Sequence, residues 1–287
     1  TNVISGNSDR GVCFETAYIS TASTGTRIQG NFIGTDRSGT IAIANSVGIG
    51  QNLNGYVGDL TVGTDGDGLN DELEGNLISG NSWGIRLGTY GQLVVAGNKI
   101  GTNLAGDKAI ANSIGIWFDA GTGRIGTNGN GTSDSLEANT ISGNSGSGIK
   151  VSAATKLEIF GNRIGTNSAG TAAIANISGI TVEDGRVDIG GTQSIQRNII
   201  SGNTVNGIQA LVTIGNIVGN YIGTDITGLS AIPNQIGIDS VVALNGSCTI
   251  RSNLVSGNSQ WGMRITGNNN FVAGNYVGTD VTGEKPI

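Results

Sequence analysis

The chain has no histidine, and it is poor in several other residue types that proteins use for chemistry. Histidine is the commonest general acid–base residue and a common metal ligand, so its absence argues against many enzyme classes. Charged residues make up 13% of the 287 residues, and the net charge of −6 provides no basic stripe for nucleic-acid binding. No run of 18 apolar residues occurs, so we expect no membrane insertion.

Glycine is abundant, at 51 residues, and it recurs in two short repeated strings that alternate along the chain. The string Asn-x-Ile/Val-Ser-Gly-Asn begins at Asn2, Asn76, Asn139, Asn198 and Asn253. The string Gly-Asn-x-Ile/Val-Gly-Thr begins at Gly30, Gly97, Gly161, Gly219 and Gly274. It is followed by Ala-Ile-Ala-Asn or Ala-Ile-Pro-Asn at Ala42, Ala109, Ala173 and Ala231. Internal similarity of this kind is the signature of a repeat architecture.

A third string, glycine followed by an apolar and then a variable residue, marks every repeat. Its glycines are Gly11, Gly48, Gly84, Gly115, Gly148, Gly179, Gly207, Gly237 and Gly262, at intervals of 25 to 37 residues. Apolar and variable residues alternate around it, as in Ile149, Lys150 and Val151, which predicts β-strands. One such coil cannot bury its own apolar face, whereas stacked coils bury a common column.

We therefore predict an all-β fold, a single-stranded parallel β-helix of about nine coils in two alternating types. The handedness of parallel β connections makes it right-handed. The recurrent turn asparagines, such as Asn31 and Asn98, are predicted to stack as amide ladders that also satisfy the turn backbone. Cys13 and Cys248 lie about eight coils apart in this arrangement, too far for a disulfide.

Together these strings resemble the parallel β-helix repeats of large bacterial and archaeal cell-surface proteins. The resemblance covers essentially the whole chain, so we predict one domain over residues 1–287 with no separate capping domain. It implies an extracellular or cell-surface location. It does not select a function, because such repeats occur in adhesin-like stalks, filament proteins and polysaccharide-active enzymes alike.

Two coils carry an insertion before Asn-x-Ile-Ser-Gly-Asn, and the first, residues 64–74, is acidic. Its spacing resembles a calcium loop of the EF-hand or thrombospondin-repeat type, although Gly63 stands where the first acidic ligand is expected. The predicted Ca²⁺ ligands are Asp65, Asp67, the carbonyl of Leu69, Asp71 and Glu74. The second insertion keeps the spacing with fewer charges and predicts a weaker site at Asn128, Asn130, Asp134 and Glu137. The alternative is that both are surface turns rich in Asx and glycine.

Outward side chains of the third string are expected to form columns on the rod surface, with neighbours about 4.8 Å apart. Arg86, Trp117 and Lys150 should be adjacent, and Trp117 could stack on a sugar ring. Asp119 and Glu183 are the catalytic candidates, because carboxylates two coils apart approach the spacing of an inverting pair. The alternative is a mixed solvated surface with one exposed aromatic ring.

Pectin-cleaving β-helices are the natural enzymes for comparison. The clustered aspartate pairs, Gly-His-Gly and Arg-x-Lys of the polygalacturonase-like members are absent, and only Arg86 and Lys150 echo the basic residue of the lyases. The sequence leaves catalysis open but favours a protein without it.

Neither end of the sequence contains an amphipathic helix that would cap a solenoid. Uncapped coils expose strand edges that can pair. We therefore expect either a piece of a longer repeat protein or copies that stack head to tail into filaments. The predicted function is that of a non-catalytic stalk, adhesin segment or filament subunit, with neighbouring repeats or further copies as partners. The alternative is a polysaccharide-binding or polysaccharide-cleaving protein that acts through Trp117.

Overall fold

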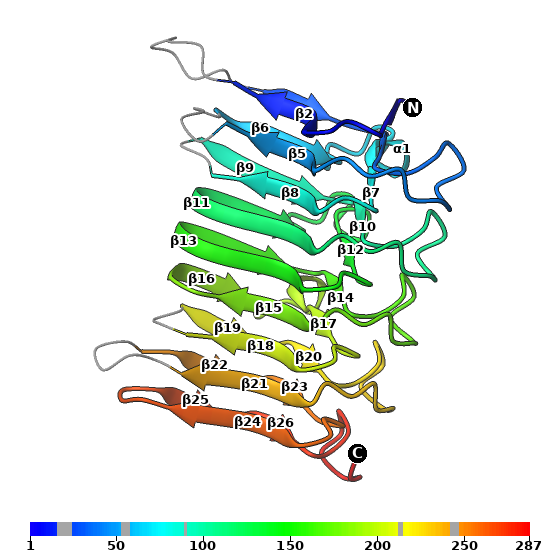
Figure 1. The fold of residues 1–287 in the computed structure, drawn as a ribbon. Helices are drawn as coiled ribbons and strands as arrows, with labels where there is room; N and C mark the ends of the chain where they lie inside the picture. Colours follow the sequence, from blue (N-terminus) through cyan, green and yellow to red (C-terminus); the bar gives the residue numbers. More distant parts are fainter. Residues whose placement is uncertain (16–24, 53–57, 89–90, 212–214, 242–246) are drawn as a thin grey trace.

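In the computed structural model the chain winds into a parallel β-helix with three strand positions in each coil (Figure 1). The structure describes residues 1–15, 25–52, 58–88, 91–211, 215–241 and 247–287. Strands account for 46% of the described residues and helices for 3%. Each strand pairs in parallel with its equivalents in the coils before and after it. The predicted fold class is confirmed.

The strands form three columns, which we call faces 1, 2 and 3. Face 1 comprises β2 (Arg10–Phe14), β5 (Val47–Gln51), β8 (Trp83–Leu87), β11 (Ile114–Gly126), β13 (Ser147–Phe160), β15 (Ser178–Val182), β18 (Asn206–Ala210), β21 (Ile236–Val241) and β24 (Trp261–Thr266). These nine strands confirm the nine predicted coils. Strands β11 and β13 continue into face 2, where they pair with its strands.

Face 2 otherwise comprises β3 (Thr26–Ile28), β6 (Leu60–Gly63), β9 (Gln92–Ala96), β16 (Gly185–Ile189), β19 (Asn216–Val218), β22 (Thr249–Arg251) and β25 (Phe271–Ala273). Face 3 comprises β1 (Val3–Ile4), β4 (Phe32–Ile33), β7 (Leu77–Ile78), β10 (Lys99–Ile100), β12 (Thr140–Ile141), β14 (Arg163–Ile164), β17 (Ile199–Ile200), β20 (Tyr221–Ile222), β23 (Leu254–Val255) and β26 (Tyr276–Val277). The strings Asn-x-Ile/Val-Ser-Gly-Asn and Gly-Asn-x-Ile/Val-Gly-Thr thus supply the face 3 strands of alternate coils.

The core is one continuous apolar cluster that runs along the inside of the rod. The isoleucine or valine of the repeated strings points into it in every coil before the last, and Ile33, Ile78 and Ile100 are completely buried. Because side chains alternate between the two sides of a strand and the strands pair in register, the inward residues align coil after coil. The alternation of apolar and variable residues in the sequence therefore predicts which side chains form the core.

Two unbroken ladders of asparagine side chains line the turns on either side of face 3. In each ladder, every amide nitrogen donates to the side-chain oxygen of the next asparagine. The first ladder contains Asn2, Asn31, Asn76, Asn98, Asn139, Asn162, Asn198, Asn220, Asn253 and Asn275. The second contains Asn7, Asn45, Asn81, Asn112, Asn144, Asn176, Asn203, Asn234 and Asn258. The predicted amide ladders are confirmed.

Hairpin arms follow face 3 in alternate coils and project from the rod on the right of Figure 1. They span residues 35–42, 102–109, 166–173, 224–231 and 279–286, and each is closed by an antiparallel bridge between its ends. Successive arms are joined by backbone hydrogen bonds, such as that from Leu104 to Gly39. The arms cover outward residues of face 3, so Leu77, Ile199 and Leu254 are at most 4% exposed.

Three insertions lie between face 2 and face 3. The first, residues 64–75, contains the short helix α1 (Asp71–Glu74), and the second spans residues 127–138. The third, residues 190–197, contains the 3₁₀ turn η1 (Ser194–Gln196).

In the described part of the chain no helix has the length and apolar character needed to span a membrane. Both cysteines are free, as predicted, with Cys13 exposed and Cys248 buried.

Candidate functional sites

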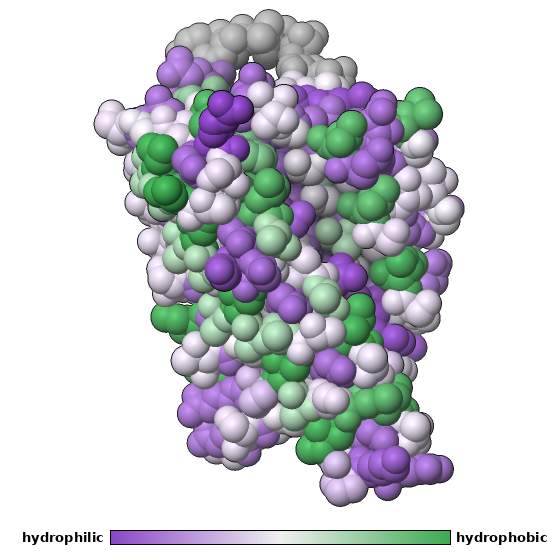
Figure 2. Space-filling view, turned by 90° about the vertical axis from the view of Figure 1, so that its right-hand side faces the viewer, coloured by the Kyte–Doolittle hydropathy of each residue, from purple (hydrophilic) through white to green (hydrophobic). Residues whose placement is uncertain are grey.

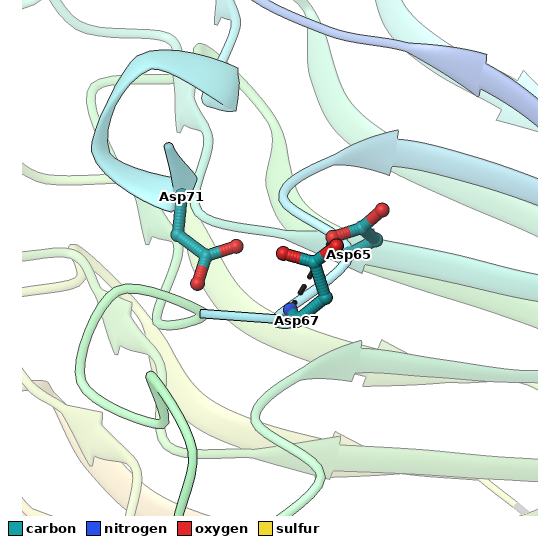
Figure 3. Close-up of side chains that lie close together, drawn as sticks. All are labelled: Asp65, Asp67 and Asp71. Carbon is teal, nitrogen blue, oxygen red and sulfur yellow. Dashed lines mark hydrogen bonds between the residues drawn. The ribbon is translucent and has the colours of Figure 1, made fainter. Parts of the chain in front are cut away.

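The first insertion brings three of its predicted ligands together. Carboxylate oxygens of Asp65, Asp67 and Asp71 all lie within 4.8 Å of one another (Figure 3). Asp65 and Asp67 follow the end of β6, whereas Asp71 comes from the first turn of α1. A cluster of three carboxylates is the kind of oxygen-rich arrangement that a hard divalent cation such as Ca²⁺ prefers.

Asp71 anchors this loop. It is 3% exposed, and its two oxygens accept hydrogen bonds from Thr64 Oγ1 at 2.6 Å and from the Gly68 N–H at 2.9 Å. Hydrogen bonds from the hydroxyl groups of Ser133 and Thr64 hold the pKa of Asp71 below its ordinary value, against the opposing effect of burial. Asp71 therefore stays ionised at neutral pH.

The other predicted ligands are held differently. Arg27 Nη1 lies 2.9 Å from Asp65 Oδ2 as a charge contact without the alignment of a hydrogen bond. Glu74 does not join the cluster; its carboxylate accepts a hydrogen bond from the Asp65 N–H at 3.2 Å. The Leu69 side chain is 68% exposed, and its N–H donates to Asp67 at 2.8 Å.

The second insertion has the same architecture without the acidic cluster. Its Thr127 stands 63 residues after Thr64, and it donates to Asp134 as Thr64 does to Asp71. Asn128 and Asn130 accept the backbone hydrogen bonds that Asp65 and Asp67 accept in the first insertion. Asparagine oxygens therefore suffice to build this turn.

Glu137, the last ligand predicted in the second insertion, is fully committed to internal contacts. It is completely buried, pairs with Arg124 at 3.2 Å and accepts hydrogen bonds from Thr127 Oγ1 and the Asn128 N–H. Within the described residues, the carboxylates of this insertion form no cluster like that of Asp65, Asp67 and Asp71.

The insertions stack on one another along the rod, and the third was not identified from the sequence. Gly66, with a φ of 70°, approaches the second insertion so closely that a Cβ would lie 2.5 Å from Glu137 Oε1. Gly129 packs in turn against Gln193 and Gln196 of the third insertion. The spacing of 63 residues between Thr64 and Thr127 places the next insertion at position 190, and that period was the available signal.

The predicted column of Arg86, Trp117 and Lys150 is present, with the three residues opposite one another on β8, β11 and β13. The Arg86 guanidinium lies 4.3 Å and the Lys150 ammonium 4.5 Å from the centre of the Trp117 ring. The two cations come from the strands on either side of β11, so the indole lies between them. A ring stacked in this way is stabilised by cation–π attraction.

The two catalytic candidates are each held by one of these cations. Asp119 pairs with Arg86 at 3.1 Å, and Glu183 pairs with Lys150 at 2.9 Å. Trp117 Nε1 donates to Ser152 Oγ at 2.9 Å, and Ser152 donates to Glu183 at 3.2 Å. The column and its neighbours therefore form one connected network of charges and hydrogen bonds on face 1.

Comparison of the chain with protein-family models, with curated proteins and with solved structures gives no match in any of the three.

Proposed function

We propose that this chain is a structural rod of the cell surface or extracellular space, extended end to end by coils of the same kind, and without catalytic activity. The observation that carries the proposal is the pair of asparagine ladders that run the described length of the rod. They join every coil to the next by side-chain hydrogen bonds in addition to the strand pairing. Each coil contacts mainly its neighbours, so the stack can be continued without altering it.

The last coil supports end-to-end stacking. Val277 is 51% exposed, whereas Val255, its partner in the preceding coil, is completely buried. Tyr276 is likewise 49% exposed while its partner Leu254 is 3% exposed. A further coil would cover these side chains. We propose that in the purified protein a second copy supplies this coil.

The ladders also have a direction that suits this arrangement. Amide nitrogens donate toward the C-terminal end throughout, from Asn2 to Asn275. A copy that places its Asn2 on Asn275 would therefore bring an asparagine oxygen to the donor end of the first ladder. Head-to-tail contacts of this heterologous kind generate open filaments.

Electron microscopy of the purified chain tests the stacking. Wild-type protein should form filaments one rod in width, and Val277→Lys should abolish them because it places a charge at the contact. Val241→Lys is the matched control, since Val241 is 41% exposed on the side of the rod and should leave filaments intact. Equal loss in both variants, or no filaments from the wild type, would contradict the proposal.

A screen of polysaccharide cleavage tests the absence of catalysis. Asp119 and Glu183 are each neutralised by an adjacent cation, and we expect no cleavage of any substrate. Cleavage that is lost in Asp119→Ala would replace the structural proposal with an enzymatic one.

We also propose that Asp65, Asp67 and Asp71 bind Ca²⁺ and so clip the stacked insertions together. The second insertion supports this, because Asn128 and Asn130 build the same turn without charge. The carboxylates of Asp65 and Asp67 are therefore not required for the turn, and their mutual repulsion would be relieved by a cation.

A further inference from the structure

A hollow on the outside of face 3 contains two arginines that the repeat architecture does not explain. Figure 2 views the rod from the side on which the arms project in Figure 1. The hollow has a volume of about 150 Å³. Its lining comes from the second and third insertions, from β14 and β17 of face 3, and from Ile226 of an arm. The volume is below the roughly 300 Å³ at which drug-sized pockets begin, so it suits a small group.

Arg163 forms part of the floor. It lies on β14 between Thr140 and Ile199 of the neighbouring coils, and its side chain points out of the solenoid under the flanking segments. Its Nε is buried and has no hydrogen-bond partner. Burial also lowers the pKa of the guanidinium, as expected for a cation removed from water without a counter-ion.

Arg197, from the end of the third insertion, lines the same hollow. Its guanidinium lies 4.1 Å from the centre of the Tyr221 ring, and its Nε donates to the Gly219 carbonyl at 3.2 Å. These contacts hold the side chain in place. No carboxylate within the described residues pairs with it or with Arg163.

The other arginines of the chain are either paired with a carboxylate or exposed to water. Five pair with carboxylates, namely Arg10, Arg27, Arg86, Arg124 and Arg264. Arg37, Arg186 and Arg251 are exposed and so remain hydrated. Half-buried guanidinium groups without an acidic partner occur, among the described residues, only at Arg163 and Arg197, and both line one hollow.

Asp134 is the acidic residue of the lining, and it is already engaged. Its carboxylate accepts hydrogen bonds from Thr127 Oγ1 and from the Gly131 N–H, both at 2.9 Å. The charged groups of the lining therefore sum to one net positive charge. Ser135 and Ser194 add hydroxyl groups at its exposed rim.

We propose that this hollow binds a small oxyanion, a carboxylate or sulfate group, between the guanidinium groups of Arg163 and Arg197. An oxyanion would supply the acceptor that Arg163 Nε lacks and would compensate a charge that is costly to bury alone. The chemistry is shared by free inorganic anions and by acidic sugars, and the experiment distinguishes them. The site is independent of end-to-end stacking, because it lies on the side of the rod.

Isothermal titration of the whole chain with sodium sulfate, sodium glucuronate and glucose tests the proposal. Wild-type protein should bind at least one of the two anions saturably and should not bind glucose. Arg163→Gln should bind that anion roughly tenfold or more weakly, because charge-assisted hydrogen bonds to the ligand are lost. Arg186→Gln, which removes an exposed unpaired arginine, is the matched control and should bind like the wild type.

The two anions assign the source of the ligand. Tighter binding of glucuronate indicates a sugar acid, and tighter binding of sulfate indicates an inorganic anion. Should Arg163→Gln not fold, as judged by circular dichroism, Arg197→Gln serves in its place. No saturable binding of either anion by the wild type, or binding equal to wild type in a folded Arg163→Gln or Arg197→Gln variant, would overturn the proposal.

Discussion

Replacement of one ladder asparagine in the middle of the rod should be strongly destabilising. Asn139 is completely buried, and its Nδ2 donates to the Val95 carbonyl at 2.8 Å and to Asn162 Oδ1 at 2.8 Å. Its Oδ1 accepts from the N–H and the Nδ2 of Asn98, at 3.0 and 3.1 Å. Alanine at this position would remove all four hydrogen bonds and leave buried polar groups in two other coils without a partner.

The size of the effect follows from those orphaned groups. Each buried donor or acceptor left unsatisfied costs about 1–3 kcal/mol. The Asn98 N–H and the Val95 carbonyl are the groups most affected. Asn139→Ala should therefore lower the free energy of unfolding by about 3–4 kcal/mol. Guanidinium denaturation measures this. Asn130→Ala is the control, because Asn130 is exposed and accepts one local hydrogen bond from Thr132. A loss below about 1 kcal/mol in Asn139→Ala would refute the claim that the ladders hold the coils together.

Further results are expected at three other sites. Trp117→Ala should lower stability by about 2 kcal/mol through loss of packing and cation–π contacts, and it should leave binding on a sugar array unchanged; altered sugar binding would favour the polysaccharide alternative. Added Ca²⁺ should raise the thermal midpoint of the wild type but not of Asp65→Asn/Asp67→Asn, and an equal rise in both would contradict the calcium proposal. Burial raises the pKa of Cys248 to about 12, so a thiol reagent should modify Cys13 alone in the native protein and both cysteines after denaturation. The raised pKa means that the folded state favours the protonated thiol of Cys248. The free energy of unfolding should therefore be unaffected by Cys248 below about pH 9 and should fall as the pH rises toward 12. The Cys248→Ala variant should lack this fall.

The in-and-out pattern of face 1 could be predicted because glycine marks the same position in every coil. Once Gly84, Gly115 and Gly148 are aligned, the residues two places further on must be neighbours, and Arg86, Trp117 and Lys150 are indeed opposite one another. What the pattern did not predict is the pairing of Arg86 with Asp119 and of Lys150 with Glu183. Those contacts join different columns and depend on how long side chains bend, which a strand period does not describe.

The outside of face 3 could not be predicted in the same way. Alternation places Leu77 and Ile199 on the outside of their strands, where exposure is expected, yet both are buried beneath arms and insertions. The hollow around Arg163 is built from segments of several coils that share no motif. The third insertion also lacks the acidic residues that made the first recognisable, so only its period connects it to the others.

Electron microscopy of the wild-type chain beside Val277→Lys and Val241→Lys is the most direct test of the central claim, that this is a structural rod which stacks end to end. We predict filaments for the wild type and for Val241→Lys, and separate short rods for Val277→Lys. Separate short rods for the wild type at every concentration, or filaments that persist in Val277→Lys, would contradict it.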